Sequence, residues 1–162
     1  MKHTNYQIVN RTRYALGSSK KSVNSKSFRG TRNRNPLNIK YVKTTVWVGQ
    51  VRDIERSDEV FAEFTDMKYG LRAAIKLLRR YIALGFDRVH TIIYRWCPDH
   101  TARAYEQTVL WRMRYNLPKF DPDKPIDRHD RDTLYHLVRA MAWVESRYEV
   151  TREEFDEAWK LM

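Results

Sequence analysis

The chain has 162 residues, of which 42% are hydrophobic and 13% aromatic, so it can form one domain with a sizeable core but not two. Its net charge of +11 lies in the first third, because residues 1–52 contain twelve Lys and Arg and no acidic residue. No apolar run approaches the ~20 residues of a membrane helix. The N-terminus lacks the apolar segment of a signal peptide, and the single Cys97 excludes an intramolecular disulfide.

Residues 1–64 are predicted to form an arm, a loop and a hairpin. Residues 1–28 are basic and end in a low-complexity Ser/Lys stretch, which predicts a flexible arm. Residues 29–39 combine Gly, Pro and several Asn, which are typical of a shaped loop. Residues 44–51 are rich in β-branched and aromatic residues, and residues 59–64 show an alternating pattern, so we expect two strands that pair as a hairpin around residues 52–58.

The rest of the chain is predicted to be helical. Apolar residues at three- and four-residue spacing predict helices between Asp66 and Gly85, over residues 88–96 and about 101–115, onward from Asp132, and onward from Thr151. Asp66 and Asp132 are the expected N-caps, and Thr151 with Glu154 fits a capping box. The fold class is therefore α+β and mainly helical, with one small hairpin and about five helices in a single domain over residues 29–162.

Four sequence motifs, in order along roughly residues 28–115, carry a family resemblance. They are Arg29-Gly30-x-Arg32-Asn33-x-Asn35-Pro36-Leu37-Asn38-Ile39, Trp47-x-Gly49, Phe61-x-x-Phe64 followed by Tyr69-Gly70-x-Arg72-Ala73, and Ile92-Ile93-x-Arg95-Trp96-x-Pro98 with Tyr105 downstream. In combination they resemble a family of phage and prophage virion-associated proteins that are similar to the lysozyme-like superfamily. The order also resembles cell-wall glucosaminidases and lytic transglycosylases. The resemblance implies a lysozyme-like domain in which the Asn-rich loop and a hairpin wall a sugar cleft.

The catalytic acid that the resemblance implies is absent from its usual place. In those enzymes the catalytic Glu precedes the Asn-rich loop, whereas this chain has no Asp or Glu before Asp53. Residues 137–148, however, resemble the helix of lytic transglycosylases that ends in Glu-Ser, and they put Glu145 at its end. A circularly permuted lysozyme-like fold would bring this helix beside the Asn-rich loop.

Glu145 is the predicted general acid. Cleavage of a glycosidic bond requires a carboxylic acid that stays protonated near neutral pH. Glu145 fits because it ends an apolar helix next to Trp143 and Tyr148, and the alternative is a surface glutamate near an arginine. The resemblance to transglycosylases implies that one carboxylate can suffice, since the substrate supplies the nucleophile. If a second carboxylate is required, the candidates are Asp53, Glu55 and then Glu63.

The candidate substrate-binding residues come from the same motifs. They are Arg29, Asn33, Asn35, Asn38, Trp47, Tyr69, Arg72, Trp96 and Tyr105. Arg and Asn side chains could hydrogen-bond N-acetyl sugars, or they could pair with an acid and cap a tight loop. The tryptophans could stack on sugar rings or pack in the core. The spacing of the His residues fits no metal motif, so no metal or other cofactor is expected, and Cys97 is interpreted as a packed thiol.

The sequence therefore predicts a phage-derived protein that cleaves the glycan strands of peptidoglycan, of the muramidase or lytic transglycosylase type. We expect synthesis in the host cytoplasm without a signal peptide, action in a virion or at the cell wall, and no membrane partner. One alternative is a non-catalytic virion or wall-binding protein with the same fold. Another is binding of nucleic acid, another anionic polymer or other virion proteins through the basic residues 1–52.

Overall fold

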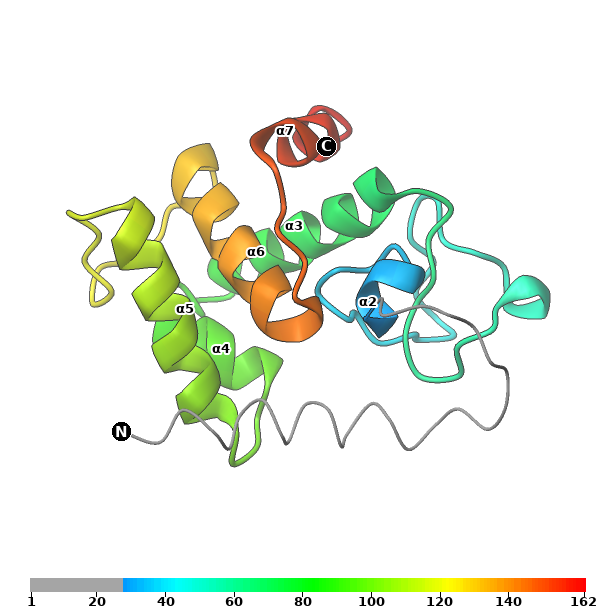
Figure 1. Ribbon diagram of the computed structural model, residues 1–162, viewed down its shortest axis with the longest axis horizontal. Helices are drawn as coiled ribbons and strands as arrows, with labels where there is room; N and C mark the ends of the chain where they lie inside the picture. The colour runs from blue at the N-terminus through cyan, green and yellow to red at the C-terminus, as the bar shows by residue number, and fades with distance from the viewer. Residues whose placement is uncertain (1–27) are drawn as a thin grey trace.

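The computed structural model describes residues 28–162 and is mainly helical, as predicted (Figure 1). Its helices are α2 (Arg29–Arg32), α3 (Met67–Ala83), α4 (Val89–Trp96), α5 (Ala102–Asn116), α6 (Arg131–Ser146) and α7 (Arg152–Lys160), with a 3-10 helix η1 (Asp53–Glu55). The prediction of a flexible arm falls on residues 1–28, and residues 1–27 lie outside the described residues. Within residues 28–162, no helix is both long and apolar enough to span a membrane.

The longest helix, α3, begins and ends where its sequence predicts. The Asp66 side chain accepts a hydrogen bond from the backbone N–H of Lys68 at 3.0 Å, which caps the first turn. Gly85 has a φ of 90° in the left-handed region, where a glycine is favoured. It lets the backbone N–H of Phe86 bond the carbonyl of Tyr81 at 3.0 Å, a Schellman motif that satisfies the last carbonyls.

The other helices begin and end close to their predicted boundaries, with two differences. The capping box of Thr151 and Glu154 opens α7 as predicted. The N-cap of α6 is Asp130, not Asp132, because the Asp130 carboxylate accepts from both the backbone N–H and the hydroxyl of Thr133. Residues 29–32, predicted as the start of a loop, form the single helical turn α2.

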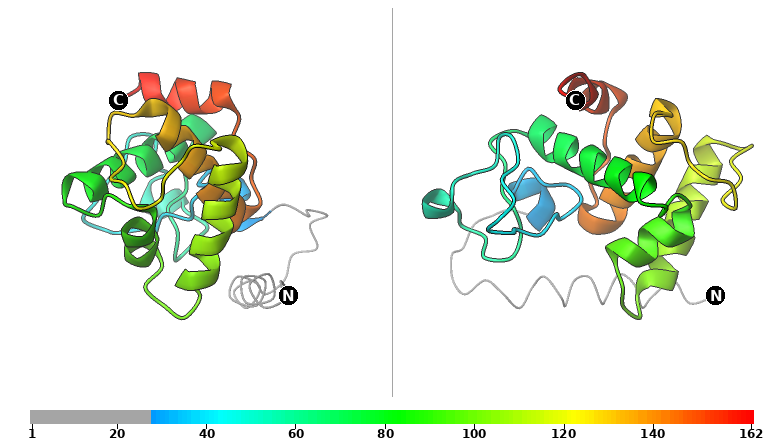
Figure 2. Two further views of the ribbon diagram at one scale, coloured as in Figure 1. Left: turned by 90° about the vertical axis from the view of Figure 1, so that its left-hand side faces the viewer. Right: turned by 180° about the vertical axis from the view of Figure 1, so that it is seen from behind.

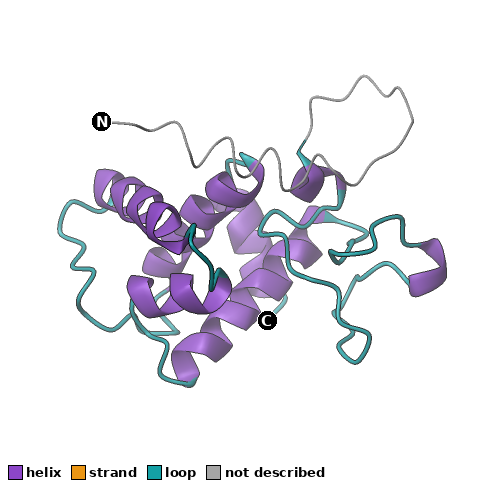
Figure 3. Cartoon of the chain, turned by 90° about the horizontal axis from the view of Figure 1, so that it is seen from below, coloured by secondary structure: helices purple, strands orange, loops and turns teal. Residues whose placement is uncertain are grey.

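The predicted hairpin is not found as a regular ladder in the part of the chain that the structure describes. Only two isolated antiparallel bridges occur, Lys40 with Phe61 and Gln50 with Phe64. Val46 is 83% exposed, so the segment predicted as the first strand has no buried face to hold it in a continuous register. The segment around residues 60–65 therefore pairs briefly with two separate stretches, and the intervening chain stays irregular (Figure 3).

The core is built around α6, which packs against α5 on one side and α3 on the other, while α7 covers α3. Leu134, Leu137, Val138 and Met141 on α6 are fully buried, as expected for the apolar face of a central helix. The loop-rich residues 33–66 lie at one end of the molecule and α4 with α5 at the other (Figures 1 and 2). The C-terminal end of α6 packs against α2, so it meets the loop region.

Candidate functional site

The carboxylate of Glu145 lies where the end of α6 meets the Asn-rich loop. Its Oε2 accepts a hydrogen bond from Asn38 Nδ2 at 3.1 Å, and its Oε1 accepts one from Trp96 Nε1 at 3.1 Å. Asn38 Nδ2 also lies 3.1 Å from the backbone carbonyl of Glu145. Three predicted site residues are therefore in contact, although Asn38 is 107 positions from Glu145 and Trp96 is 49.

The end of α6 is fixed to the loop by the residue after Glu145. Ser146 is fully buried, and its hydroxyl donates to the backbone carbonyl of Pro36 at 2.8 Å. Gly30 on α2 packs directly against this hydroxyl, because a Cβ built on Gly30 would overlap Ser146 Oγ. Arg147 has a φ of 53°, a left-handed conformation that ends the helix. The Glu-Ser pair thus ends α6 at a close contact with the Asn-rich loop.

Asn35 shapes this loop from inside. Its side chain is fully buried and donates to the backbone carbonyls of Ile39 and Ala62, at 2.9 and 2.8 Å. Its Oδ1 accepts from the backbone N–H of Ile39 at 2.9 Å. These bonds satisfy the amide within the protein, so Asn35 holds the loop rather than facing a ligand.

Arg29 and Asn33 bind a buried carboxylate that the sequence did not identify. Both guanidinium donors Nε and Nη2 of Arg29 contact Asp58, and Asn33 Nδ2 donates to Asp58 Oδ2 at 2.7 Å. Burial alone would raise the pKa of Asp58, but hydrogen bonds from Arg29, Asn33 and the backbone N–H groups of Phe61 and Val60 outweigh it and lower the pKa to about 2. Arg29 and Asn33 therefore stabilise the loop region through Asp58.

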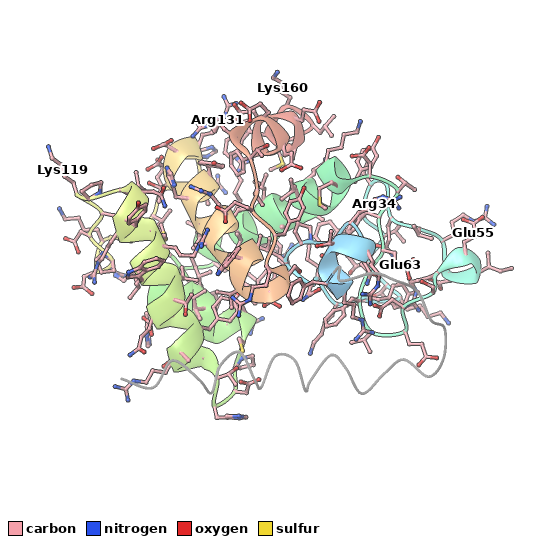
Figure 4. All side chains as sticks on the ribbon, viewed as in Figure 1. Arg34, Glu55, Glu63, Lys119, Arg131 and Lys160 are labelled. Carbon is pink, nitrogen blue, oxygen red and sulfur yellow. The ribbon has the colours of Figure 1, made fainter. Side chains whose placement is uncertain are left out.

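The acids proposed as a second carboxylate lie elsewhere. Asp53 and Glu55 belong to the exposed η1, and Glu55 projects outward at the far tip of the loop region (Figure 4). Asp53 hydrogen-bonds the Tyr41 hydroxyl, which raises the pKa of Tyr41. The Glu63 carboxylate accepts from the backbone N–H and hydroxyl of Ser57, at 2.7 and 2.8 Å. None of these three acids is among the groups that contact Glu145 in the described hydrogen bonds.

The remaining predicted binding residues serve packing or other contacts. Trp47 and Tyr69 are half-buried against the core, and Gly49 packs on the Tyr69 ring. Arg72 Nε donates to the backbone carbonyl of Leu161 at 2.8 Å, which ties α3 to the end of the chain. Tyr105 is 1% exposed and belongs to the core.

Cys97 is a half-buried thiol beside this site. Its Sγ lies 3.2 Å from Thr101 Oγ1 and 3.6 Å from Asp99 Oδ1. Burial raises the pKa of the Cys97 thiol, and the charges of Asp99 and Glu145 raise it further, against a lowering by the Thr101 hydrogen bond. A thiol in this setting stays protonated and is a poor nucleophile.

The described residues contain no cluster suited to a metal ion, and a cavity among them lies away from Glu145. Among residues 28–162, no cluster of three or more His, Cys, Asp or Glu side chains is arranged to hold a metal ion. A cavity of about 650 Å³ is lined by residues that include Phe120, Ile126 and Asp130. Asp130 caps the opposite end of α6, about 22 Å from Glu145 along the helix axis at ~1.5 Å per residue. The cavity is therefore separate from the Glu145 contacts.

Comparison with known proteins gives one partial relationship. No family model matches the chain. Protein P5 of Pseudoalteromonas phage PM2 is 38% identical to it over 74 residues, which is 44% of this chain and 45% of that protein. The match spans less than half the length of either protein. Part of the chain is thus related to a phage protein.

Proposed function

We propose that the chain is a phage-derived, peptidoglycan-directed protein of the lytic transglycosylase type, with Glu145 as its acid and base. In this proposal the domain is a circularly permuted lysozyme-like fold, because its Glu-Ser helix follows the Asn-rich loop in the chain. The partial relationship to a phage protein is consistent with a role in a virion or during lysis. The glycan strands of the cell wall would be its substrate.

The hydrogen bond between Asn38 and Glu145 carries the proposal. The family resemblance rests on the Asn-rich loop and on a helix ending in Glu-Ser, two segments that are distant in the sequence. Their direct contact at 3.1 Å is what a permuted site requires. The buried hydroxyl of Ser146 supports the same point, since it bonds the Pro36 carbonyl within that loop.

A single carboxylate suffices for the proposed reaction. Protonated Glu145 would donate its proton to the leaving glycosidic oxygen, and a hydroxyl of the same sugar would attack the anomeric carbon. Glu145 would then accept the proton of that hydroxyl, which restores the acid and leaves an internal anhydro bridge without consuming water. The donors Asn38 and Trp96 stabilise the charged carboxylate that remains once Glu145 has given its proton to the leaving oxygen. The exposed positions of Asp53 and Glu55 favour this route over one with two carboxylates.

Loss of turbidity of purified sacculi tests the proposal. The wild type should clear a suspension and release soluble glycan fragments, and Glu145→Gln should reduce the rate at least ~100-fold, because the substituted amide cannot transfer the proton. Glu157→Gln on α7 is the matched control, since Glu157 is exposed and should leave the rate unchanged. Equal rates for wild type and Glu145→Gln would remove Glu145 from the mechanism.

A non-catalytic virion or wall-binding protein is the second candidate. It is favoured by the internal hydrogen bonds of Asn33 and Asn35, which leave these predicted sugar ligands committed to Asp58 and to the backbone. Co-sedimentation of the wild type with sacculi, without any released fragment, would support this candidate and contradict the enzymatic one.

A further inference from the structure

The side-chain hydrogen bonds of Asn38 both go to one residue, Glu145. Its amide Nδ2 donates to the Glu145 carboxylate and to the Glu145 backbone carbonyl, and each N···O distance is 3.1 Å. Both partners are acceptors, so the orientation of the amide is determined by its contacts. The side chain therefore fixes the end of α6 and the direction of the carboxylate together.

The backbone and surroundings of Asn38 restrict what can replace it. Its φ of 51° lies in the left-handed region, which Asn, Asp and Gly tolerate better than other residues. The residue is 7% exposed, and within the described residues its Oδ1 has no hydrogen-bond partner. That oxygen faces Gly30, where a Cβ would lie 2.8 Å away. The left-handed backbone and the close approach of Gly30 therefore limit which residues can replace Asn38.

Trp96 binds the other oxygen of the Glu145 carboxylate, the one that Asn38 does not contact. Its indole Nε1 can only donate, and it donates to Glu145 Oε1 at 3.1 Å. Trp96 and Asn38 come from separate segments, so rotation of the carboxylate would break at least one of the two bonds. Neither donor titrates, so together they orient the carboxylate without adding a net charge.

We propose that Asn38 is a positioning residue that, with Trp96, clamps the Glu145 carboxylate in one orientation, and that it is not a sugar ligand. The role of the clamp in catalysis rests on the proposed function, whereas the clamp itself does not. The ionisable groups next to these contacts in the sequence include Arg29, Arg32, Arg34, Arg95, Cys97, Asp99 and Arg147. Of these, Arg29 hydrogen-bonds the Asp58 carboxylate, and the Arg147 guanidinium lies over the ring of Trp143.

Titration of the Trp96 indole N–H by NMR tests the clamp without any substrate. The resonance, assigned with Trp96→Phe, should report protonation of Glu145 because the two groups are bonded. Asn38→Asp keeps the backbone conformation and places a second carboxylate against Glu145, so the midpoint should rise by at least ~1 pH unit. Asn116→Asp makes the same charge change at an exposed site and should leave it unchanged. An unchanged midpoint in Asn38→Asp would overturn the clamp.

Kinetics on soluble glycan fragments separate positioning from sugar binding. For a positioning residue, Asn38→Gly should lower kcat by about 10- to 100-fold with little change in KM, because a displaced carboxylate is misaligned. A rise in KM at unchanged kcat would identify Asn38 as a sugar ligand and contradict the proposal. If the wild type cleaves no glycan while the NMR midpoint shifts as expected, the clamp stands and the proposed function fails.

Discussion

At the scale of single residues, the buried Asp58 carboxylate links stability to pH. Its side chain is 6% exposed and is paired with Arg29. Because its pKa falls from 3.8 to about 2 in the folded protein, it contributes stability above the unfolded pKa that is lost as the pH falls through the folded pKa. The stabilised form is therefore the charged carboxylate.

We predict that Asp58 accounts for about 2 kcal/mol of unfolding free energy that disappears between about pH 4 and pH 2. Asp58→Asn should be less stable at neutral pH and show a flatter pH dependence in that window. Urea unfolding at a series of pH values measures both effects. A variant with the wild-type slope between pH 4 and pH 2 would contradict the assignment.

Some of the contacts made by single residues could be predicted from the sequence, and others could not. Glu145 was predicted as a site residue from the Glu-Ser ending of an apolar helix, and Asn38 from the Asn-rich motif, and the structure places the two in contact. Asp58 was missed because its partners Arg29 and Asn33 are 29 and 25 positions away, and no local pattern encodes that pairing. Long-range ion pairs of this kind depend on the tertiary fold, which periodicity does not specify.

At the scale of elements, the contact of α2 with the end of α6 depends on Gly30. A Cβ at this position would overlap Ser146 Oγ and crowd Asn35 and Asn38. We predict that Gly30→Ala lowers the unfolding free energy by about 2–3 kcal/mol, in the range of overpacked sites. It should also shift the Trp96 indole resonance, since the Glu145 contacts lie beside this interface.

Gly85→Ala is the matched control for that prediction. Gly85 has a φ of 90°, but a Cβ there meets nothing within 4 Å. The cost should be about 1 kcal/mol, from the left-handed conformation alone, with no change at the Trp96 resonance. Chemical unfolding and one-dimensional NMR of both variants provide the comparison, and equal losses would show that the Ser146 overlap is relieved without cost.

The capping box of α7 gives a second prediction at this scale. The Thr151 hydroxyl accepts from the Glu154 backbone N–H at 3.2 Å, and the Glu154 carboxylate accepts from the Thr151 N–H at 2.9 Å. Thr151→Ala should cost about 1 kcal/mol, measured by thermal or urea unfolding, while Thr44→Ala in an exposed loop should cost almost nothing. A loss no larger than that of Thr44→Ala would mean that α7 is held by its packing on α3 alone.

Helices were more predictable than the loop region for a physical reason. The apolar faces and caps of α3 and α7 are local in sequence, so they predict boundaries well. The first strand of the expected hairpin was predicted from the β-branched and aromatic residues of residues 44–51, where Val46 and Val48 are exposed in the structure. Without a buried face, strand propensity alone does not establish a ladder.

At the scale of the whole molecule, the excess positive charge is concentrated in the N-terminal third of the chain. Residues 1–52 hold twelve of the 31 basic residues and none of the acidic ones, and part of this segment, residues 1–27, lies outside the described structure. We predict that neutralising Lys20, Lys21 and Lys26 to Gln in the full chain weakens binding to sacculi and reduces its salt dependence.

Co-sedimentation with sacculi between 50 and 500 mM salt, about the range over which screening acts, measures this effect. A parallel titration with duplex DNA separates the two classes of polyanion, because a DNA-binding arm would prefer DNA and show a steep salt slope. Retention on sacculi that is the same for the triple variant and the wild type at every salt concentration would show that the arm has no part in wall binding.

The most direct test of the central claim is the mass of the glycan fragments released from purified sacculi. A single-carboxylate transglycosylase with Glu145 as acid and base should release fragments that end in an internal anhydro sugar, lighter by one water than hydrolysed fragments. Glu145→Gln should release almost none, while Glu157→Gln matches the wild type. Hydrated fragments would indicate hydrolysis with a second carboxylate, and fragments released equally by Glu145→Gln would contradict the account.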